Sequence, residues 1–96
     1  MNSSDVEALI LQALENLNEE HPADRKLNVR PEMVLFGRNA ELDSLSLVSL
    51  VVEVETLLNN RHGIDVVLAD ERAMARDVLP FTNVGTLRDY IVELIG

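Results

Sequence analysis

The residues best suited to chemistry lie at Asp43-Ser44-Leu45, where a polar loop meets the most apolar segment of the chain. Asp43 and Ser44 both suit a helix N-cap, because a short side-chain oxygen accepts an unpaired backbone N–H. An exposed serine at a helix start also favours phosphate, through backbone donors and the helix dipole. A nearby acid can help to bind a metal ion on a phosphorylated substrate. The stretch therefore predicts either a capped helix start alone or one whose Ser44 accepts a phosphate-linked group.

A serine hydrolase is the enzyme alternative, and it would need Ser44 activated by a histidine that an acid orients. The two histidines are His21 and His62. His62 lies at the far end of the helix that Ser44 begins, about 27 Å away at 1.5 Å per residue. His21 lies in a loop, so its distance stays open. The sequence contains no Gly-x-Ser-x-Gly and no His-Glu-x-x-His, and we expect neither an enzyme nor a metal site.

The composition predicts one small domain, residues 1–96, with an aliphatic core. Hydrophobic residues make up 47% of the 96 residues, but aromatic residues only 3%. The chain has no cysteine and therefore no disulfide framework, which fits a reducing cytoplasm. The start lacks the basic flank and apolar run of a signal peptide, and no run is long enough to span a membrane. We expect a cytoplasmic monomer.

The net charge of −9 comes from 17 acidic residues against 8 Lys and Arg residues. This balance disfavours nucleic acid, whose binding depends on contacts between cations and phosphates. It favours encounter with basic protein surfaces, although solubility alone also explains it.

Hydrophobic periodicity predicts an all-α fold of three longer helices plus one short helix, at about residues 4–17, 44–60, 71–76 and 84–95. Ser4 and Glu7 fit a capping box for the first helix. A long loop separates the first two helices, and its apolar cluster, Met33 to Phe36, is expected to pin it to the core, in one short helical turn. Asp70 is expected to cap the short helix and Gly63 to end the second helix. In the last helix, the apolar spacing predicts a buried stripe of Val84, Leu87, Ile91 and Leu94, flanked by Tyr90 and Ile95.

The second helix has apolar residues on two sides. The broad side is the expected core face, with Leu47, Leu50, Val51, Val54, Leu57 and Leu58. Leu45, Val48 and Val52 lie well round from its centre, beside Ser44 and with Glu55. A helix of this kind is either deeply buried or offers one side to a partner, and the pattern does not choose between the two.

The order of these elements resembles the acyl carrier proteins, which bind phosphopantetheine. The resemblance covers about residues 6–94 and rests on three motifs in family-like order and spacing. They are Leu42-Asp43-Ser44-Leu45 followed by Glu53 and Glu55, then His62-Gly63-Ile64-Asp65, then the segment from Phe81 to Ile91. The resemblance implies a four-helix acyl-carrier-like bundle.

The resemblance also implies a function. A phosphopantetheinyl transferase would attach 4′-phosphopantetheine from coenzyme A to Ser44, assisted by Asp43 near its metal ion. The protein would then present an acyl thioester to enzymes that load, extend or transfer it in fatty-acid, lipid or specialised-metabolite synthesis. Basic surfaces of those enzymes would dock on Leu45, Val48, Val52, Glu53 and Glu55. Alternatives are a peptidyl or amino-acyl carrier domain and an unmodified helical adaptor.

Several positions depart from the family pattern. Glu41 stands where many members have glycine, Ser46 and Ser49 replace acids that usually follow the serine, and the segment from Ala69 to Phe81 is longer than in compact fatty-acid carriers. These departures favour a specialised carrier at least as much as a housekeeping one.

Overall fold

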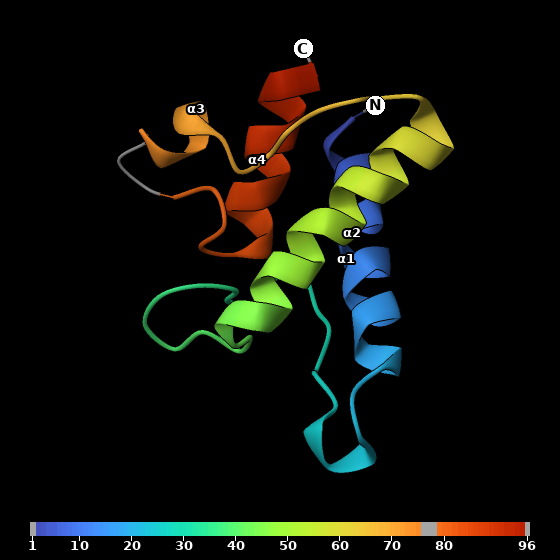
Figure 1. Cartoon of the computed structure of the whole chain (residues 1–96), viewed down its shortest axis with the longest axis vertical. Helices are drawn as coiled ribbons and strands as arrows, with labels where there is room; N and C mark the ends of the chain where they lie inside the picture. The colour runs from blue at the N-terminus through green and yellow to red at the C-terminus, as the bar shows by residue number, and fades with distance from the viewer. Residues whose placement is uncertain (1, 76–78, 96) are drawn as a thin grey trace.

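The computed structural model describes residues 2–75 and 79–95 of the chain. Those residues form three longer helices and no β-strand: α1 (Ser3–Glu19), α2 (Ser44–His62) and α4 (Val84–Ile95). Figure 1 shows α2 crossing in front of α1, with α4 beside them and both chain ends at the top of the view. The radius of gyration, 12.6 Å, is that of a compact domain of this length. The predicted all-helical class is confirmed for the described residues.

A single helical turn, α3 (Glu71–Met74), lies in the connection between α2 and α4. Asp70 caps this turn by accepting the Ala73 amide at 3.3 Å, as predicted. The predicted short helix extends to Arg76, which lies outside the described residues. The described residues therefore do not establish a fourth helix, and the four-helix bundle stays a prediction.

The start of α1 differs from the prediction. Asn2 is the N-cap: its side-chain oxygen accepts the Asp5 amide at 2.8 Å, and the Asp5 carboxylate accepts the Asn2 amide at 3.5 Å. The predicted capping box of Ser4 and Glu7 is wrong, because Asn2 and Asp5 have the same spacing two residues earlier and suit the same geometry. Glu7 instead pairs with Arg88 of α4 at 3.1 Å.

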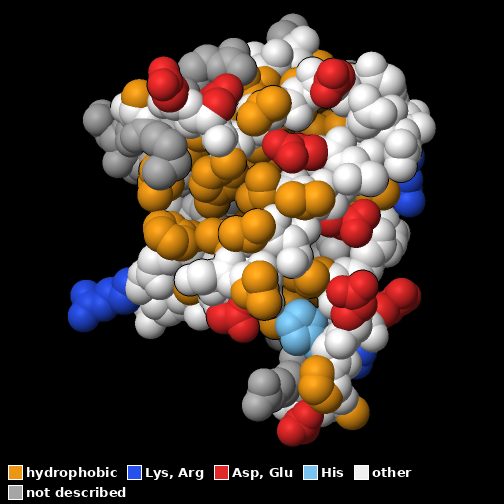
Figure 2. All heavy atoms as spheres, viewed as in Figure 1, with side chains coloured by type: hydrophobic (Ala, Val, Ile, Leu, Met, Phe, Trp, Pro, Cys, Tyr) orange, Lys and Arg blue, Asp and Glu red, His pale blue; other side chains and the backbone are white. Residues whose placement is uncertain are grey.

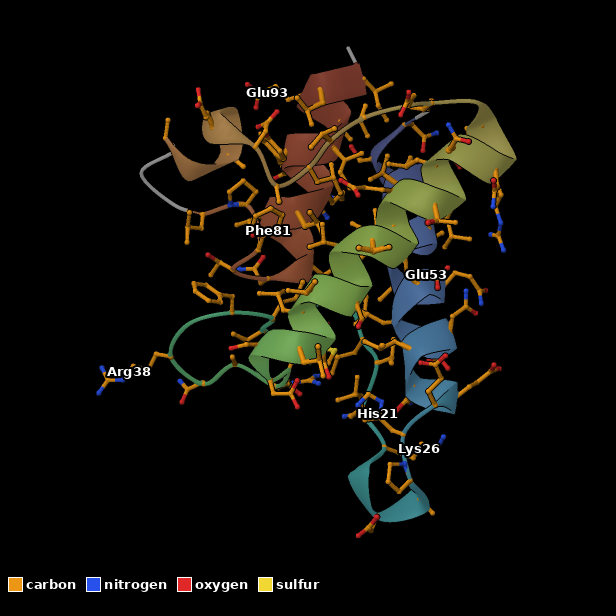
Figure 3. All side chains as sticks on the ribbon, viewed as in Figure 1. His21, Lys26, Arg38, Glu53, Phe81 and Glu93 are labelled. Atoms are coloured by element: carbon orange, nitrogen blue, oxygen red, sulfur yellow. The ribbon has the colours of Figure 1, made fainter. Side chains whose placement is uncertain are left out.

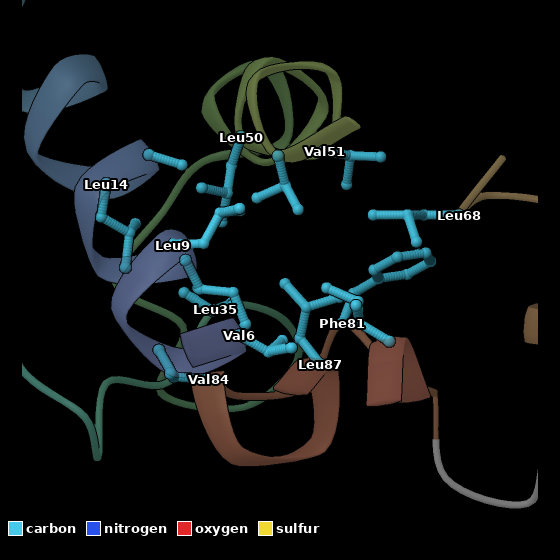
Figure 4. Close-up of a cluster of buried hydrophobic side chains, with 14 of the residues drawn as sticks. Val6, Leu9, Leu14, Leu35, Leu50, Val51, Leu68, Phe81, Val84 and Leu87 are labelled. Atoms are coloured by element: carbon cyan, nitrogen blue, oxygen red, sulfur yellow. The ribbon is translucent and has the colours of Figure 1, made fainter. Parts of the chain in front are cut away.

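The core lies between the three helices and is aliphatic except for Phe81 and Tyr90. α1 packs directly against both α2 and α4. Figure 4 shows Leu35, Leu68 and Phe81 among the core side chains that meet between the helices. The predicted stripe of α1 is buried, and it comprises Val6, Leu9, Ile10, Ala13, Leu14 and Leu17. In α4 the prediction needs a correction, because Tyr90 is buried whereas Leu94 is only half-buried.

The connection from α1 to α2 is pinned to the core as predicted, but as extended chain rather than as a helical turn. A short 3₁₀ helix, η1 (Ala23–Arg25), lies earlier in it. Met33 and Leu35 are buried, and the Leu35 amide donates to the Thr82 carbonyl at 2.8 Å. Because side chains alternate along extended chain, Phe36 points outward and is 42% exposed. The loop is thereby attached to the residues just before α4.

Candidate functional site: the start of helix α2

Ser44 is the exposed first residue of α2, directly after its N-cap, as predicted. The Asp43 carboxylate accepts the Ser46 amide at 2.7 Å and fixes where the helix begins. This hydrogen bond, which favours the charged form, holds the pKa of Asp43 below its usual range. Within the described residues the Ser44 hydroxyl makes no hydrogen bond to a side chain or the backbone. It is therefore exposed and unbonded at a fixed helix end.

Ser44 heads a row of α2 residues that face one side of the molecule. Val48, Val51 and Glu55 follow it at intervals of four, three and four residues, the spacing that keeps side chains on one helix face. All three of these residues line an apolar groove of about 440 Å³. The groove therefore runs along the Ser44 side of α2.

The apolar groove lies between α2 and the chain that precedes α3 and α4. Its walls are Phe36, Leu47, Val48, Val51, Val52, Glu55, Val67, Ala69, Leu79 and Phe81. Figure 2 shows hydrophobic side chains gathered over this face, with acidic side chains bordering them. Figure 3 shows Phe81 beside α2 on the α4 side. Such a surface suits an apolar chain or an apolar side chain of a partner.

A second hollow, of about 380 Å³, lies at Ser44 itself. Asp43, Ser44 and Gly37 belong to its lining, and it shares Phe36 and Leu47 with the apolar groove. These two shared side chains form the boundary between the hollow and the groove. A group attached to Ser44 would meet this hollow first and the apolar groove beyond it.

The second apolar stripe of α2 lies outside the core. Leu45, Val48 and Val52 are 77%, 60% and 55% exposed. The sequence left open whether this stripe is buried or offered to a partner, and their exposure rules out burial within this fold. Leu50, Val51, Val54, Leu57 and Leu58 of the predicted core face are buried, and Leu47 is half-buried.

The two acids expected at the docking face lie on different sides of α2. Glu55 lines the groove, and its carboxylate accepts the Leu68 amide at 2.8 Å, which ties the far wall to α2. Glu53 shares the opposite flank with Ser46 and Ser49, because the three are spaced three and four residues apart. Both acids are half-buried. Only Glu55 therefore lies beside the exposed apolar stripe, and it already has a backbone partner.

The histidines do not come together with Ser44. His62 is the last residue of α2, at the opposite end from Ser44. His21 lines hollows that contain Ser46 but not Ser44, and its Nδ1 lies 3.1 Å from the Leu17 carbonyl. Residues two apart on a helix point to nearly opposite sides. No Ser44–His pair of the hydrolase type thus occurs among the described residues.

Sequence reasoning missed most of the groove. Phe36, Val67, Leu79 and Phe81 come from three separate segments, and no spacing in the sequence brings them together. Phe36 had no signal either, because the four residues from Met33 to Phe36 are all apolar and their sequence shows no alternation.

No family model, curated protein or solved structure matches this chain. Within residues 2–75 and 79–95, none of the helices combines the length and the apolar character needed to cross a membrane. The same residues contain no group of three potential metal-ligating side chains.

Proposed function

We propose that the protein is an acyl carrier whose Ser44 bears 4′-phosphopantetheine. The observation that carries this proposal is the position of Ser44, exposed at the capped start of α2 and at the head of the row that lines the apolar groove. A carrier needs a reactive hydroxyl that an enzyme can reach and a nearby surface that suits its cargo. The hydroxyl and one wall of the groove both belong to α2.

The residues around Ser44 fit the prosthetic group. The phosphate would stand at the N-terminus of α2, where the helix dipole favours negative charge. The arm would lie in the hollow bounded by Phe36, Gly37 and Leu47, which leads to the groove. When bound, the group supplies a terminal thiol that holds the acyl chain as a thioester.

Asp43 has two roles in this proposal. It caps α2, so that Ser44 is held at the helix start. Its carboxylate is charged at neutral pH, as an ordinary aspartate is, and a charged oxygen is what a divalent metal ion of a transferase would bind. The transferase would join the Ser44 oxygen to the pantetheine phosphorus of coenzyme A, with loss of the hydroxyl proton and release of the nucleotide part.

The exposed stripe of Leu45, Val48 and Val52 is the proposed docking surface for the transferase and for enzymes that load, extend or transfer acyl groups. A net charge of −9 would speed encounter with basic enzyme surfaces. The tethered arm would raise the local concentration of cargo at the partner, so a small and weak interface suffices. The protein itself would catalyse no reaction.

The lining of the apolar groove favours an aliphatic acyl chain over an amino-acyl cargo. Nine of its ten lining residues are apolar, and the carboxylate of the tenth, Glu55, is bonded to the Leu68 amide. A charged amino group would lose most of its hydration there, and Glu55 would be the one lining side chain that could accept from it. We therefore place the peptidyl or amino-acyl carrier second.

Intact mass after incubation with coenzyme A and a phosphopantetheinyl transferase tests the proposal. A carrier gains the mass of one phosphopantetheine group. An unmodified adaptor, which the exposed stripe of α2 would also suit, keeps its mass. A mass that never changes with several active transferases would overturn the proposed function in favour of the adaptor.

A further inference from the structure

A bidentate ion pair joins two distant parts of the loop that leads to Ser44. Arg30 Nη1 lies 2.8 Å from Glu41 Oε1, and Arg30 Nη2 lies 2.8 Å from Glu41 Oε2. Each side chain is about one-third exposed. Two parallel hydrogen bonds fix the relative orientation of the guanidinium and the carboxylate, which a single contact would not do.

The same carboxylate also binds the backbone. Glu41 Oε2 accepts the Val34 amide at 3.1 Å, and the Glu41 amide donates to the Val34 carbonyl at 2.9 Å. Arg30 Nη1 donates in addition to the Asn28 carbonyl at 2.7 Å. The Arg30–Glu41 clamp, which we define as this ion pair with its bonds to Val34 and Asn28, therefore closes the loop on itself.

The clamp connects the reactive serine to the rest of the fold. Val34 forms an isolated antiparallel bridge with Asn83, just before α4. Glu41 stands two residues before Asp43, with the buried Leu42 between them. A tight turn in which the Ala40 amide donates to the Gly37 carbonyl at 3.2 Å brings the chain back to Glu41. The clamp thus lies at the end of the turn that leads into α2.

We propose that the clamp positions Asp43 and Ser44 for modification, which makes Arg30 and Glu41 positioning residues. This inference rests on the proposed function. A partly exposed ion pair adds little to the free energy of unfolding. Its value lies in ordering the loop before the transferase binds, because a displaced reacting group slows group transfer even when the protein stays folded.

The test compares Glu41→Gln and Arg30→Met with a matched control, Glu32→Gln. Glu32 lies 3.9 Å from Arg30 Nε and is 74% exposed, so its substitution removes the same charge near Arg30 without touching the clamp. We expect Glu41→Gln and Arg30→Met each to lower kcat for Ser44 modification by roughly tenfold with KM little changed. Their double variant should be no worse than either alone, because the two residues act as one unit. Glu32→Gln should match the wild type.

Hydrogen exchange of the Val34 amide is the second readout, and it needs no transferase. Exchange should accelerate in both clamp variants, with unchanged far-UV circular dichroism, and stay as in the wild type in the control. Modification at the wild-type rate in variants whose Val34 amide has lost protection would overturn the positioning role alone. A wild type that is never modified would instead overturn the proposed function, and the positioning role with it.

Discussion

At the scale of single residues, the start of α2 could be predicted from the sequence, and the loop that supports it could not. Asp43 and Ser44 were found because caps are local: a side chain and an amide three residues on suffice. Arg30 and Glu41 are eleven residues apart in an irregular loop, and no period links them. Glu55 is predicted to face a partner, and its contact with the Leu68 amide could not be foreseen, because only the fold creates it.

Asp43→Asn and Asp43→Ala separate the cap from the charge. Asparagine caps a helix about as well as aspartate does. The thermal midpoint of Asp43→Asn should therefore stay closer to that of the wild type than the midpoint of Asp43→Ala does. Both variants lose the carboxylate, and both should slow modification by roughly tenfold or more if it helps to bind a metal ion. Equal rates for Asp43→Asn and the wild type would contradict a role for the charge.

The pH dependence of stability follows from the lowered pKa of Asp43. The folded state holds this pKa below the ordinary value of about 3.9, so the charged carboxylate stabilises the fold at neutral pH. That contribution should be lost as pH falls below about 4 and through the folded-state pKa. Urea unfolding of the wild type and Asp43→Ala from pH 7 to 2.5 should show a difference in the free energy of unfolding that shrinks in this range, because alanine neither caps the helix nor carries the charge. A constant difference would contradict the assignment.

At the scale of elements, periodicity predicted the three longer helices and the two apolar sides of α2, but not which side stays exposed. Periodicity counts residues per turn, and exposure depends on what packs against each face. The α1 cap was misplaced because two overlapping residue pairs offer the same spacing. The outward position of Phe36 was missed because all four residues of this extended segment are apolar, so their sequence shows no alternation.

Val48→Glu tests docking on α2. Because Val48 is already 60% exposed, the substitution should change the free energy of unfolding by only about 0.5 kcal/mol. It should lower transfer to or from a cognate enzyme by roughly tenfold, mainly through KM. Gln12→Glu is the charge-matched control, since Gln12 is exposed on α1 and lines neither the groove nor the hollow at Ser44. Equal effects of the two substitutions would place docking elsewhere.

Salt gives an independent test of the same surface. Exposed charges attract over about 10 Å at 0.1 M ionic strength, and added salt shortens this range. With a net charge of −9, the association rate with a basic partner should fall steadily between 0.05 and 0.5 M NaCl in a stopped-flow measurement. An association rate that does not change with salt concentration would contradict electrostatic steering.

At the scale of the whole molecule, the composition predicted an aliphatic core. The apolar groove borders this core and shares Val51 and Phe81 with it. α1 packs against both α2 and α4. Side chains of the connecting segments, such as Leu35, Leu68 and Phe81, fill the space between α2 and α4. Where this filling ends, the groove begins. Its existence could not be predicted, because it depends on how far apart two helices stand.

Acyl chain length should therefore affect stability. Each methylene moved from water into the groove contributes up to about 0.8 kcal/mol, less the cost of widening the site. Thermal midpoints should rise from the phosphopantetheine form through a series of acylated forms, because the chain binds only the folded state. A flat series would show that the cargo stays outside the groove.

The most direct test of the central claim counts thiols, because the chain has no cysteine of its own. After incubation with coenzyme A and a transferase, removal of small molecules and reaction with a maleimide, the wild type should bear one label per chain. Ser49→Ala, an exposed serine on the same helix, should also bear one label, and Ser44→Ala should bear none while keeping its helical circular dichroism. A wild type without label, or a labelled Ser44→Ala, would contradict the assignment of Ser44 as the attachment site.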